Sequence, residues 1–199
     1  MIVLGLGNPG EEYARTRHNA GFLVVEAARE RWKGGRWKRG PLATEATVRY
    51  AGEAHRLIRP TTYMNASGEV ARELLRRGAS PRDLFVVLDD MDLPLGRLRM
   101  RAEGGSGGHR GLQSLLDALA PASIGRLRVG VGRPEAGDAV DHVLSGFSSG
   151  EWERMEAMVG AAVDALELLL RRGLQAAMDR FNGRPAPWDE PEQRDGGGR

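Results

Sequence analysis

The chain has 199 residues, 41% of them hydrophobic and 28% charged, which is the size and composition of one globular domain. It contains no cysteine, which excludes a disulfide framework, a thiolate nucleophile and a zinc–thiolate site and agrees with a reducing cytoplasm. The formal net charge is only +2, but every basic residue except Lys33 and Lys38 is an arginine, the side chain whose fork of donors suits phosphate.

The first half of the chain predicts strands separated by two helices. Residues 2–6 form an apolar run that ends in a Gly-Asn-Pro-Gly turn, as a buried strand does. No basic region precedes this run and no later run is long enough to span a bilayer, so we expect neither a signal peptide nor a membrane span. The remaining elements predicted here are a helix at about 20–32 with Asn19 as its N-cap, a loop at 33–40, strands at 42–49 and 54–59 joined at Gly52, and a helix at 67–77 closed by Gly78.

The second half continues the alternation of strands and helices. We predict strands at 84–88, 97–101 and 126–131, a glycine loop at 104–108, and helices at 110–119, 151–172 and from there to about 182. Interleaved strands and helices indicate an α/β fold: a single domain, residues 1–183, with a twisted, mixed and mostly parallel sheet flanked by helices. Residues 184–199 are rich in proline, glycine and acid, which predicts a disordered tail.

The first motif is GLGNPG, at residues 5–10. It fits the G-x-G-x-x-G pattern of dinucleotide-binding proteins, but that use requires a helix that begins at the last glycine, and the next strong helical run begins only at about Ala20. We therefore rank a dinucleotide-dependent oxidoreductase low. The turn instead presents Asn8 at the carboxyl end of a strand, where open α/β sheets place ligands; local hydrogen bonding of the turn is the alternative reason for an asparagine there.

His18 directly precedes the first predicted helix. The positive end of that helix favours the neutral imidazole, which is the form that accepts a proton. A capping or surface role is the simpler explanation for one histidine at such a position. His55 and His142 have no neighbouring motif, while His109 adjoins the glycine loop and is a lesser candidate. No metal-ligand spacing of histidines occurs in the sequence, so we expect no metal site.

Asn65 lies in the segment PTTYMNASG, which joins a strand to a helix. Its amide and the free amides of the helix start suit a carbonyl oxygen or the oxyanion that develops from it. Capping of the helix by Asn65 or Ser67 is the alternative. Met64 is expected either in the core or on an apolar rim.

Three carboxylates follow a buried strand in DDMDLPLG: Asp89, Asp90 and Asp92. One of them is suited to orient a histidine by accepting a hydrogen bond from it. A divalent cation site or the capping of a turn would use the same acids, and spacing alone does not decide between the three uses.

Arginines dominate residues 97–133, where only Glu103 and Asp117 follow the acidic turn. Arg97, Arg99 and Arg101 share one face of a predicted strand, and Arg126 and Arg128 share a face of another. For any single arginine a solvated surface is explanation enough, but the cluster favours nucleic acid. No G-x-S-x-G nucleophile elbow is present, so water is the better candidate nucleophile.

Taken together, four blocks resemble the bacterial-type peptidyl-tRNA hydrolase family: GLGNPG, TRHNAGF, PTTYMNASG, and DDMDLPLG with GGSGGHRG. They occur in the order and spacing of the family, and DHVLSGF with the helix after it resembles the helical lid of the family. The resemblance implies a hydrolase of translation that binds tRNA at its acceptor stem and CCA end and cleaves the ester joining a peptide to the tRNA 3′ ribose. It also implies a cytoplasmic monomer without a cofactor.

The resemblance implies a role for each matching residue. His18 would be the general base that activates water, Asp89 would orient it, and Asn8 and Asn65 would position the ester and stabilise the oxyanion. The remaining roles are contacts to the peptide side by Met64, further substrate contacts by Tyr13, His109 and Arg110, and tRNA contacts by Arg99, Arg101 and Arg128.

One position departs from the family pattern. The family block most often reads Gly-Gly-His-Asn-Gly, whereas this chain has Arg110 after His109. The role of the usual asparagine in holding water does not carry over to a longer, charged side chain, and a phosphate or the substrate carbonyl is the alternative ligand. The main rival to the enzyme is therefore a non-catalytic RNA-binding relative with the same fold, against which the intact His18 and Asp89 argue.

Overall fold

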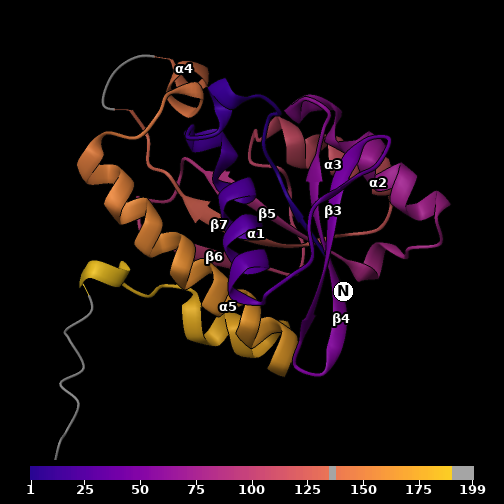
Figure 1. Cartoon of the computed structure of the whole chain (residues 1–199). Helices are drawn as coiled ribbons and strands as arrows, with labels where there is room; N and C mark the ends of the chain where they lie inside the picture. Colours follow the sequence, from indigo (N-terminus) through magenta and orange to yellow (C-terminus); the bar gives the residue numbers. More distant parts are fainter. Residues whose placement is uncertain (135–137, 190–199) are drawn as a thin grey trace, which may run out of the picture.

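A seven-stranded sheet organises the part of the chain that the computed structural model describes, residues 1–134 and 138–189 (Figure 1). Its strands are β1 (Ile2–Gly5), β2 (Lys38–Arg39), β3 (Ala43–Tyr50), β4 (Glu53–Pro60), β5 (Leu84–Asp90), β6 (Leu98–Arg101) and β7 (Gly125–Gly130). They lie in the order β2-β3-β4-β1-β5-β7-β6. Only β3 and β6 run against the other strands, because β1, β4, β5 and β7 pair in parallel and β2 is antiparallel to β3. The predicted mixed, mostly parallel sheet is confirmed.

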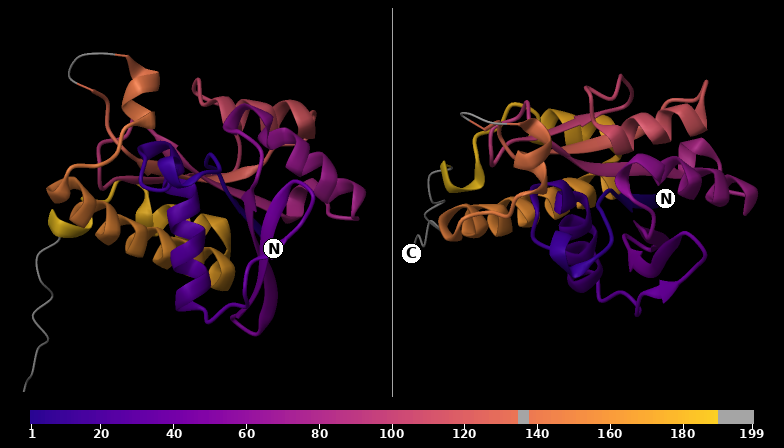
Figure 2. Two further views of the ribbon diagram at one scale, coloured as in Figure 1. Left: turned by 45° about the horizontal axis from the view of Figure 1, so that its top comes forward. Right: turned by 90° about the horizontal axis from the view of Figure 1, so that it is seen from above.

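Helices cover both faces of this sheet (Figure 2). One face packs against α1 (Ala20–Arg31) and α5 (Ser149–Phe181), and the other packs against α2 (Ser67–Arg76) and α3 (Arg110–Leu119). The short α4 (Ala139–Leu144) lies beside the N-terminal segment at the top of Figure 1. Short 3-10 turns complete the fold: η1 (Glu11–Tyr13), η2 (Arg17–Asn19), η3 (Met64–Ala66), η4 (Pro81–Asp83) and η5 (Pro187–Asp189).

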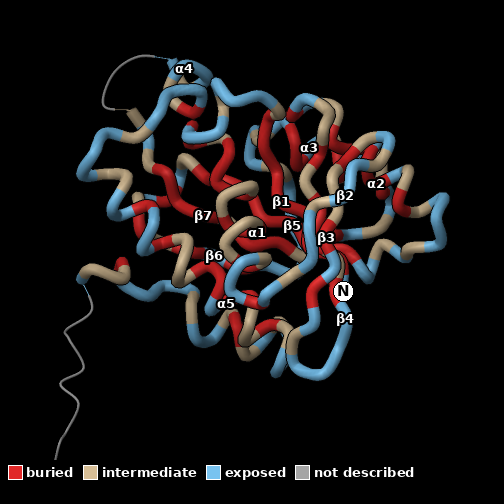
Figure 3. The backbone as a smooth tube through the Cα atoms, viewed as in Figure 1, coloured by how far each residue is buried: buried red, intermediate tan, exposed pale blue. Residues whose placement is uncertain are grey.

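Burial explains why the strands form where they do. Every residue of β5 is buried, as expected for a central strand covered by helices on both faces (Figure 3). Strand β6 instead alternates: Leu98 and Met100 enter the core under α5, and Arg99 and Arg101 are exposed on the opposite side. The sheet therefore separates two apolar cores and directs the arginines of its β6 edge toward the α2–α3 face.

A close backbone contact fixes α1 on the end of β1. A Cβ added at Gly5 would lie 2.3 Å from the carbonyl oxygen of Gly21, so no side chain fits between strand and helix. Glycine at these two positions brings the start of α1 against the carboxyl end of β1. The turn η2, which carries His18, is thereby held at the ligand-binding end of the sheet.

Three details differ from the sequence prediction, and a fourth matches it. The predicted loop at 33–40 contains the two-residue strand β2, and α4 was not predicted. The helical stretch α5 is interrupted at Gly173, with φ 84° and ψ 172°, which matches the prediction of two consecutive helices. At the C-terminus, Ala186 is buried and Trp188 packs on the core, so order extends to Asp189; the rest of the predicted tail lies outside the described residues. Within the described ranges, no helix is long and apolar enough to cross a membrane.

Candidate active site

A pocket of about 570 Å³, the strand-end pocket, lies at the carboxyl ends of β1 and β5, where the sequence motifs converge. Its lining residues come from segments far apart in the chain, and more than half of them carry polar side chains. The residues with polar side chains are Asn8, His18, Tyr63, Asn65, Asp89, Asp90, Asp92, Ser106, His109, Arg110, Arg128 and Arg133. Its apolar lining comes from Met64, Met91 and four residues of α4: Ala139, Val140, Val143 and Leu144.

Asp89 joins two histidines at the end of β5. His18 Nδ1 lies 2.9 Å and 3.1 Å from the two carboxylate oxygens of Asp89, and His109 Nε2 lies 2.9 Å from Asp89 Oδ1. The carboxylate is 2% exposed and the His18 side chain 13% exposed. The predicted meeting of residue 18 with the first acid of DDMDLPLG is therefore present in the structure, and His109 joins it from the other side.

The hydrogen bonds assign the protons of this cluster. The backbone N–H of Leu112 donates to His109 Nδ1 at 3.1 Å, so a neutral His109 carries its proton on Nε2 and donates it to Asp89. His18 in turn donates from Nδ1, which leaves its Nε2 without a partner among the described residues and able to accept a proton. Burial alone raises the pKa of Asp89, but the interactions with His109 and His18 outweigh it and hold that pKa well below its usual range.

Asn8 is held rigidly just past the end of β1. The backbone N–H of Met64 donates to Asn8 Oδ1 at 2.8 Å, which fixes the orientation of the side-chain amide. Both backbone groups of Asn8 bond the Asn19 side chain, at 2.8 Å and 3.0 Å. The Nδ2 of Asn8 has no partner among the described residues, so two N–H donors remain for a bound group.

Asn19 corrects one expectation from the sequence. It stands at the N-cap position of α1, but its side chain makes no capping hydrogen bond and holds Asn8 instead. Neither Asn65 nor Ser67 caps α2, since Ser67 Oγ donates to the Met64 carbonyl and Asn65 is exposed at the pocket. The amide of Asn65 is thus available for a ligand, as the interpretation of Asn65 as a substrate-binding residue requires.

The other candidate substrate residues lie in different surroundings. Met64 is 4% exposed, so it belongs to the core under α2 and also reaches the pocket. Arg110 is exposed in the first turn of α3 and lines the pocket. Tyr13 lies in η1 and is not among the residues that line the strand-end pocket.

The three carboxylates of DDMDLPLG diverge. Asp90 accepts from the backbone N–H of Asp92 and pairs with Arg128 at 3.0 Å, and Asp92 pairs with Arg133. They therefore share no common centre for a cation. The group that lies close enough for a metal ion among the described residues is His18, Asp89 and His109, whose ligand atoms fall within 4.8 Å. An ion there would displace the hydrogen bonds that orient both histidines.

The arginines of β6 and β7 fall into two sets, which refines the predicted basic face. Arg126 is fully buried and donates to the carbonyls of Ile124, Gly104 and Gly105. Arg128 donates to Asp90 and to Gly105 and Ser106. These two therefore hold the glycine loop, residues 104–108, against the sheet, whereas Arg99 and Arg101 are exposed and have no ion pair among the described residues.

Arg17 was not singled out in the sequence, although it adjoins His18. It is 5% exposed and donates to Ser145 Oγ, to the carbonyl of Gly146 and to Glu151 at 2.6 Å. A backbone bridge between Thr16 and Gly146 adds to this contact. Arg17 thus ties the turn that carries His18 to the segment after α4. The sequence around Arg17 did not indicate this role, because its partners lie more than a hundred residues away along the chain.

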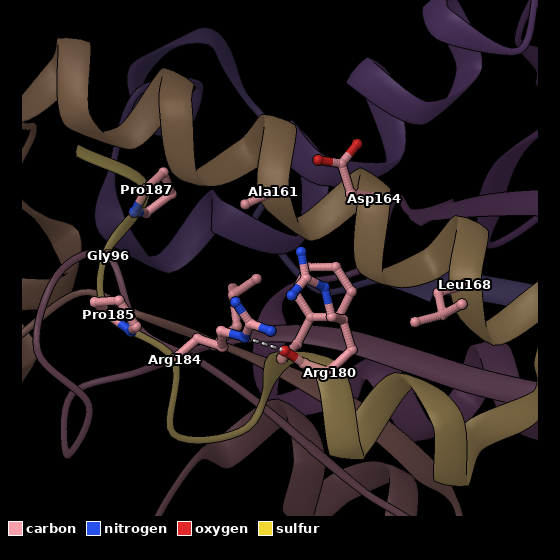
Figure 4. A pocket seen from close by; sticks show the side chains of 10 residues that line it. Gly96, Ala161, Asp164, Leu168, Arg180, Arg184, Pro185 and Pro187 are labelled. Carbon is pink, nitrogen blue, oxygen red and sulfur yellow. Dashed lines mark hydrogen bonds between the residues drawn. The ribbon is translucent and has the colours of Figure 1, made fainter. Parts of the chain in front are cut away.

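A second cavity of about 370 Å³ lies between the two parts of α5 and the C-terminal segment (Figure 4). Leu168 and Phe181 form part of its apolar lining, and Asp164, Arg180 and Arg184 bring charges to it. It shares no lining residue with the strand-end pocket. The chemistry suggested by the sequence motifs therefore belongs to the strand-end pocket alone.

The dinucleotide alternative fails on geometry. After Gly10 the chain forms the 3-10 turn η1, and the first α-helix begins at Ala20. The GLGNPG turn therefore lacks the helix N-terminus that would hold a pyrophosphate.

Known proteins resemble this chain over most of its length. Residues 2–189 match the family model described as peptidyl-tRNA hydrolase. Peptidyl-tRNA hydrolases from Synechococcus sp. and Fervidobacterium nodosum are 44% and 42% identical, over 98% and 92% of this chain and 87% and 96% of theirs. The solved structure of the Acinetobacter baumannii peptidyl-tRNA hydrolase superposes with a TM-score of 0.85 at 33% identity and covers 94% of this chain and 95% of its own. The chain belongs to the peptidyl-tRNA hydrolase family.

Proposed function

We propose that the chain hydrolyses the ester between a peptide, or an N-blocked amino acid, and the 3′ ribose of tRNA, with His18 as the general base. The observation that carries this assignment is the pairing of His18 with a buried, ionised Asp89 at the head of a pocket lined by free amides. The activity recycles tRNA from prematurely released peptidyl-tRNA. We also infer that the protein works in the cytoplasm as a monomer.

The hydrogen bond to Asp89 prepares His18 to act as a base. Asp89 accepts the proton of His18 Nδ1, so the lone pair of Nε2 is the one left for a water molecule. As water attacks the ester carbonyl, its proton passes to Nε2, and the resulting imidazolium is stabilised by the Asp89 carboxylate. The same proton then goes to the 3′ oxygen of the ribose as the ester bond breaks, which leaves a peptide carboxylic acid and a tRNA with a free hydroxyl.

Two amides are suited to the carbonyl end of the ester. Asn8 presents N–H donors in an orientation fixed by Met64 and Asn19, so little reordering is needed when the oxyanion forms. Asn65 is exposed at the same pocket, so its amide is free to bond the ester carbonyl or its oxyanion. His109 serves this arrangement by holding Asp89 in place. A preorganised donor of this kind contributes about 10²- to 10³-fold to the rate.

The two parts of the substrate need different surfaces. The peptide suits the apolar side of the pocket, where Met64 and α4 lie. The tRNA suits the exposed arginines Arg99 and Arg101 on β6, since guanidinium groups bind phosphate. Arg128 contributes positive charge nearby, although both of its terminal nitrogens are already hydrogen-bonded. Tyr13 does not line the strand-end pocket, so we assign it only a contact to a part of the substrate that lies outside this pocket.

The test is hydrolysis of N-acetyl-aminoacyl-tRNA by the purified protein. We expect release of N-acetyl amino acid by the wild type and a loss of about 10²- to 10⁴-fold in kcat for His18→Ala, which is the usual contribution of a general base. His142→Ala is the matched control, because that histidine bonds the Gly132 carbonyl and does not line the pocket.

Binding without cleavage would support the rival interpretation. A wild-type protein that binds N-acetyl-aminoacyl-tRNA but never releases the N-acetyl amino acid is a non-catalytic RNA-binding relative. Full activity in His18→Ala would show that His18 is not the general base, and another group would then have to activate the water.

A further inference from the structure

The strand-end pocket borders a second depression of different chemistry. This polar hollow, about 380 Å³, lies between α2, α3 and the glycine loop. It shares Asn65, Ser106, Gly108 and Arg110 with the strand-end pocket. Its remaining lining is Arg72, Gln113, Ser114 and Asp117, so it has no apolar side chain. A molecule that occupies one depression can therefore continue into the other past Arg110.

Arg110 differs from the other arginines of the strand-end pocket. Arg128 pairs with Asp90 and Arg133 pairs with Asp92, whereas Arg110 has no ion pair or hydrogen bond among the described residues. It is exposed and stands in the first turn of α3, where the free backbone N–H groups add positive potential. An unpaired cation at the junction of two depressions is thus left for an outside anion.

The polar hollow itself has an excess of positive charge. Arg72 is exposed on α2 and is also without an ion pair in the described part of the chain. The acid of the lining, Asp117, already accepts from Gln113, and Gln113 in turn accepts from Ser106. Ser114 Oγ is used by the backbone N–H of Gly68. Arg72, Arg110 and Asn65 are the lining side chains that make no hydrogen bond among the described residues.

The position of the hollow relates it to the basic edge of the sheet. Arg99 and Arg101 point to the α2–α3 side, since Leu98 and Met100 between them enter the core under α5. Arg72 and Arg110 belong to the helices on that same side. Unpaired guanidinium groups thus occur at the sheet edge and at the hollow, with the glycine loop between them.

We propose that Arg110, with Arg72, binds a phosphodiester of the 3′-terminal nucleotides of the substrate, and so directs the RNA strand through the polar hollow to the ester at His18. The proposal rests on the proposed function and deepens it. The two parts of the substrate match the two depressions. The side of the strand-end pocket lined by α4 is apolar and fits a peptide, whereas the polar hollow beside Arg110 is cationic and fits a sugar–phosphate chain. Arg110 here is a residue for substrate binding and specificity, not for the chemical step.

The test compares two N-acetyl-aminoacyl esters, one of adenosine, which has no phosphate, and one of the trinucleotide CCA. For Arg110→Gln we expect KM for the CCA ester to rise about three- to ten-fold, with kcat little changed, and the kinetics on the adenosine ester to stay within two-fold. The salt dependence of log(kcat/KM) for the CCA ester should become shallower by about 0.7, the value for one contact to a single strand. Arg110→Lys keeps the charge and should recover most of the affinity.

Arg82→Gln is the matched control, since this exposed arginine lies before the amino end of β5, away from the pocket at its carboxyl end. Equal loss on both esters would overturn the proposal and assign Arg110 to the ester or peptide. Loss that appears only with N-acetyl-glutamyl and not with N-acetyl-glutaminyl esters would also overturn it and indicate a carboxylate of the peptide. If the wild type cleaves neither ester nor N-acetyl-aminoacyl-tRNA, the proposed function fails. If it cleaves both esters and Arg110→Gln is unchanged, only the phosphate subsite fails.

Discussion

The acid–imidazole cluster and the arginine edge of the sheet use charge in opposite ways. At the end of β5, Asp89 is buried and both of its imidazole partners lie within hydrogen-bond distance. On β6, Arg99 and Arg101 are exposed and have no ion pair within residues 1–134 and 138–189, although their register partners on β7, Arg128 and Arg126, are bonded beneath the glycine loop. A charge that is enclosed and paired fixes geometry, whereas one left in solvent is available to a partner. Residue type alone does not separate the two uses.

The largest effect should come from removing the enclosed negative charge. Asp89→Asn keeps the size of the side chain but no longer stabilises the imidazolium that forms on His18, so we expect kcat to fall about 10²- to 10⁴-fold. Single-turnover hydrolysis of N-acetyl-aminoacyl-tRNA measures this loss, and circular dichroism checks the fold. Asp179→Asn should keep wild-type kcat, because Asp179 is an exposed acid of α5 that accepts a hydrogen bond from Gln175, on the same helix. A kcat within three-fold of wild type for Asp89→Asn would mean that His18 does not depend on the carboxylate.

The next effect separates the two members of one cross-strand pair. Arg128→Met leaves Asp90 buried without its cation, which should lower the free energy of unfolding by about 3 kcal/mol. Arg99→Met, its exposed register partner, should change that free energy by less than about 0.5 kcal/mol. Urea unfolding followed by fluorescence measures both. Asp90→Asn combined with Arg128→Met should recover part of the loss, and equal stability of the two single variants would show that burial does not distinguish them.

The difference between these regions also explains which features the sequence could predict. Strand β1 and the turn after it were predictable, because a continuous apolar run and a glycine–proline turn are local patterns. The pairing of His18 with Asp89 followed from the resemblance to a family, while His109 as the third member appeared only in space. The bonds of Arg126, Arg128, Asn19 and Arg17 were not predictable, since each depends on a segment brought near by the fold.

The short elements escaped prediction for a related reason. The two residues of β2 have no periodicity of their own and pair only because β3 offers an edge. The six residues of α4 are stabilised by a capping Asp138 and by contact with η2, not by a long apolar face. The break at Gly173 was predictable, because glycine accepts the positive φ that ends a helix.

A smaller effect concerns the pH dependence of stability. The pKa of Asp89 is lower in the folded protein than in the unfolded chain, where it is about 3.9. Asp89 therefore contributes stability above that pH, and this contribution is lost as the pH falls and the unfolded chain gains a proton that the folded protein does not bind. The free energy of unfolding of wild type relative to Asp89→Asn should decrease between pH 5 and pH 3. Glu153→Gln, an exposed acid of α5, is the control, and a difference that stays constant over this range would contradict the depressed pKa.

The smallest effects should come from the solvent-facing arginines. Arg99→Gln and Arg101→Gln each remove one contact to phosphate without disturbing a bonded group, so affinity for an acceptor-stem RNA should fall only about two- to five-fold at low salt. The slope of log affinity against log salt should become shallower by about 1 for each variant. Fluorescence anisotropy between about 50 and 200 mM salt, with Arg82→Gln as the control, measures both quantities. Because kcat on the adenosine ester involves neither arginine, it should remain at the wild-type value. A fall in that kcat would show that Arg99 or Arg101 acts on the reaction at His18. It would contradict the contrast between paired charges that fix the site and exposed charges that bind a partner.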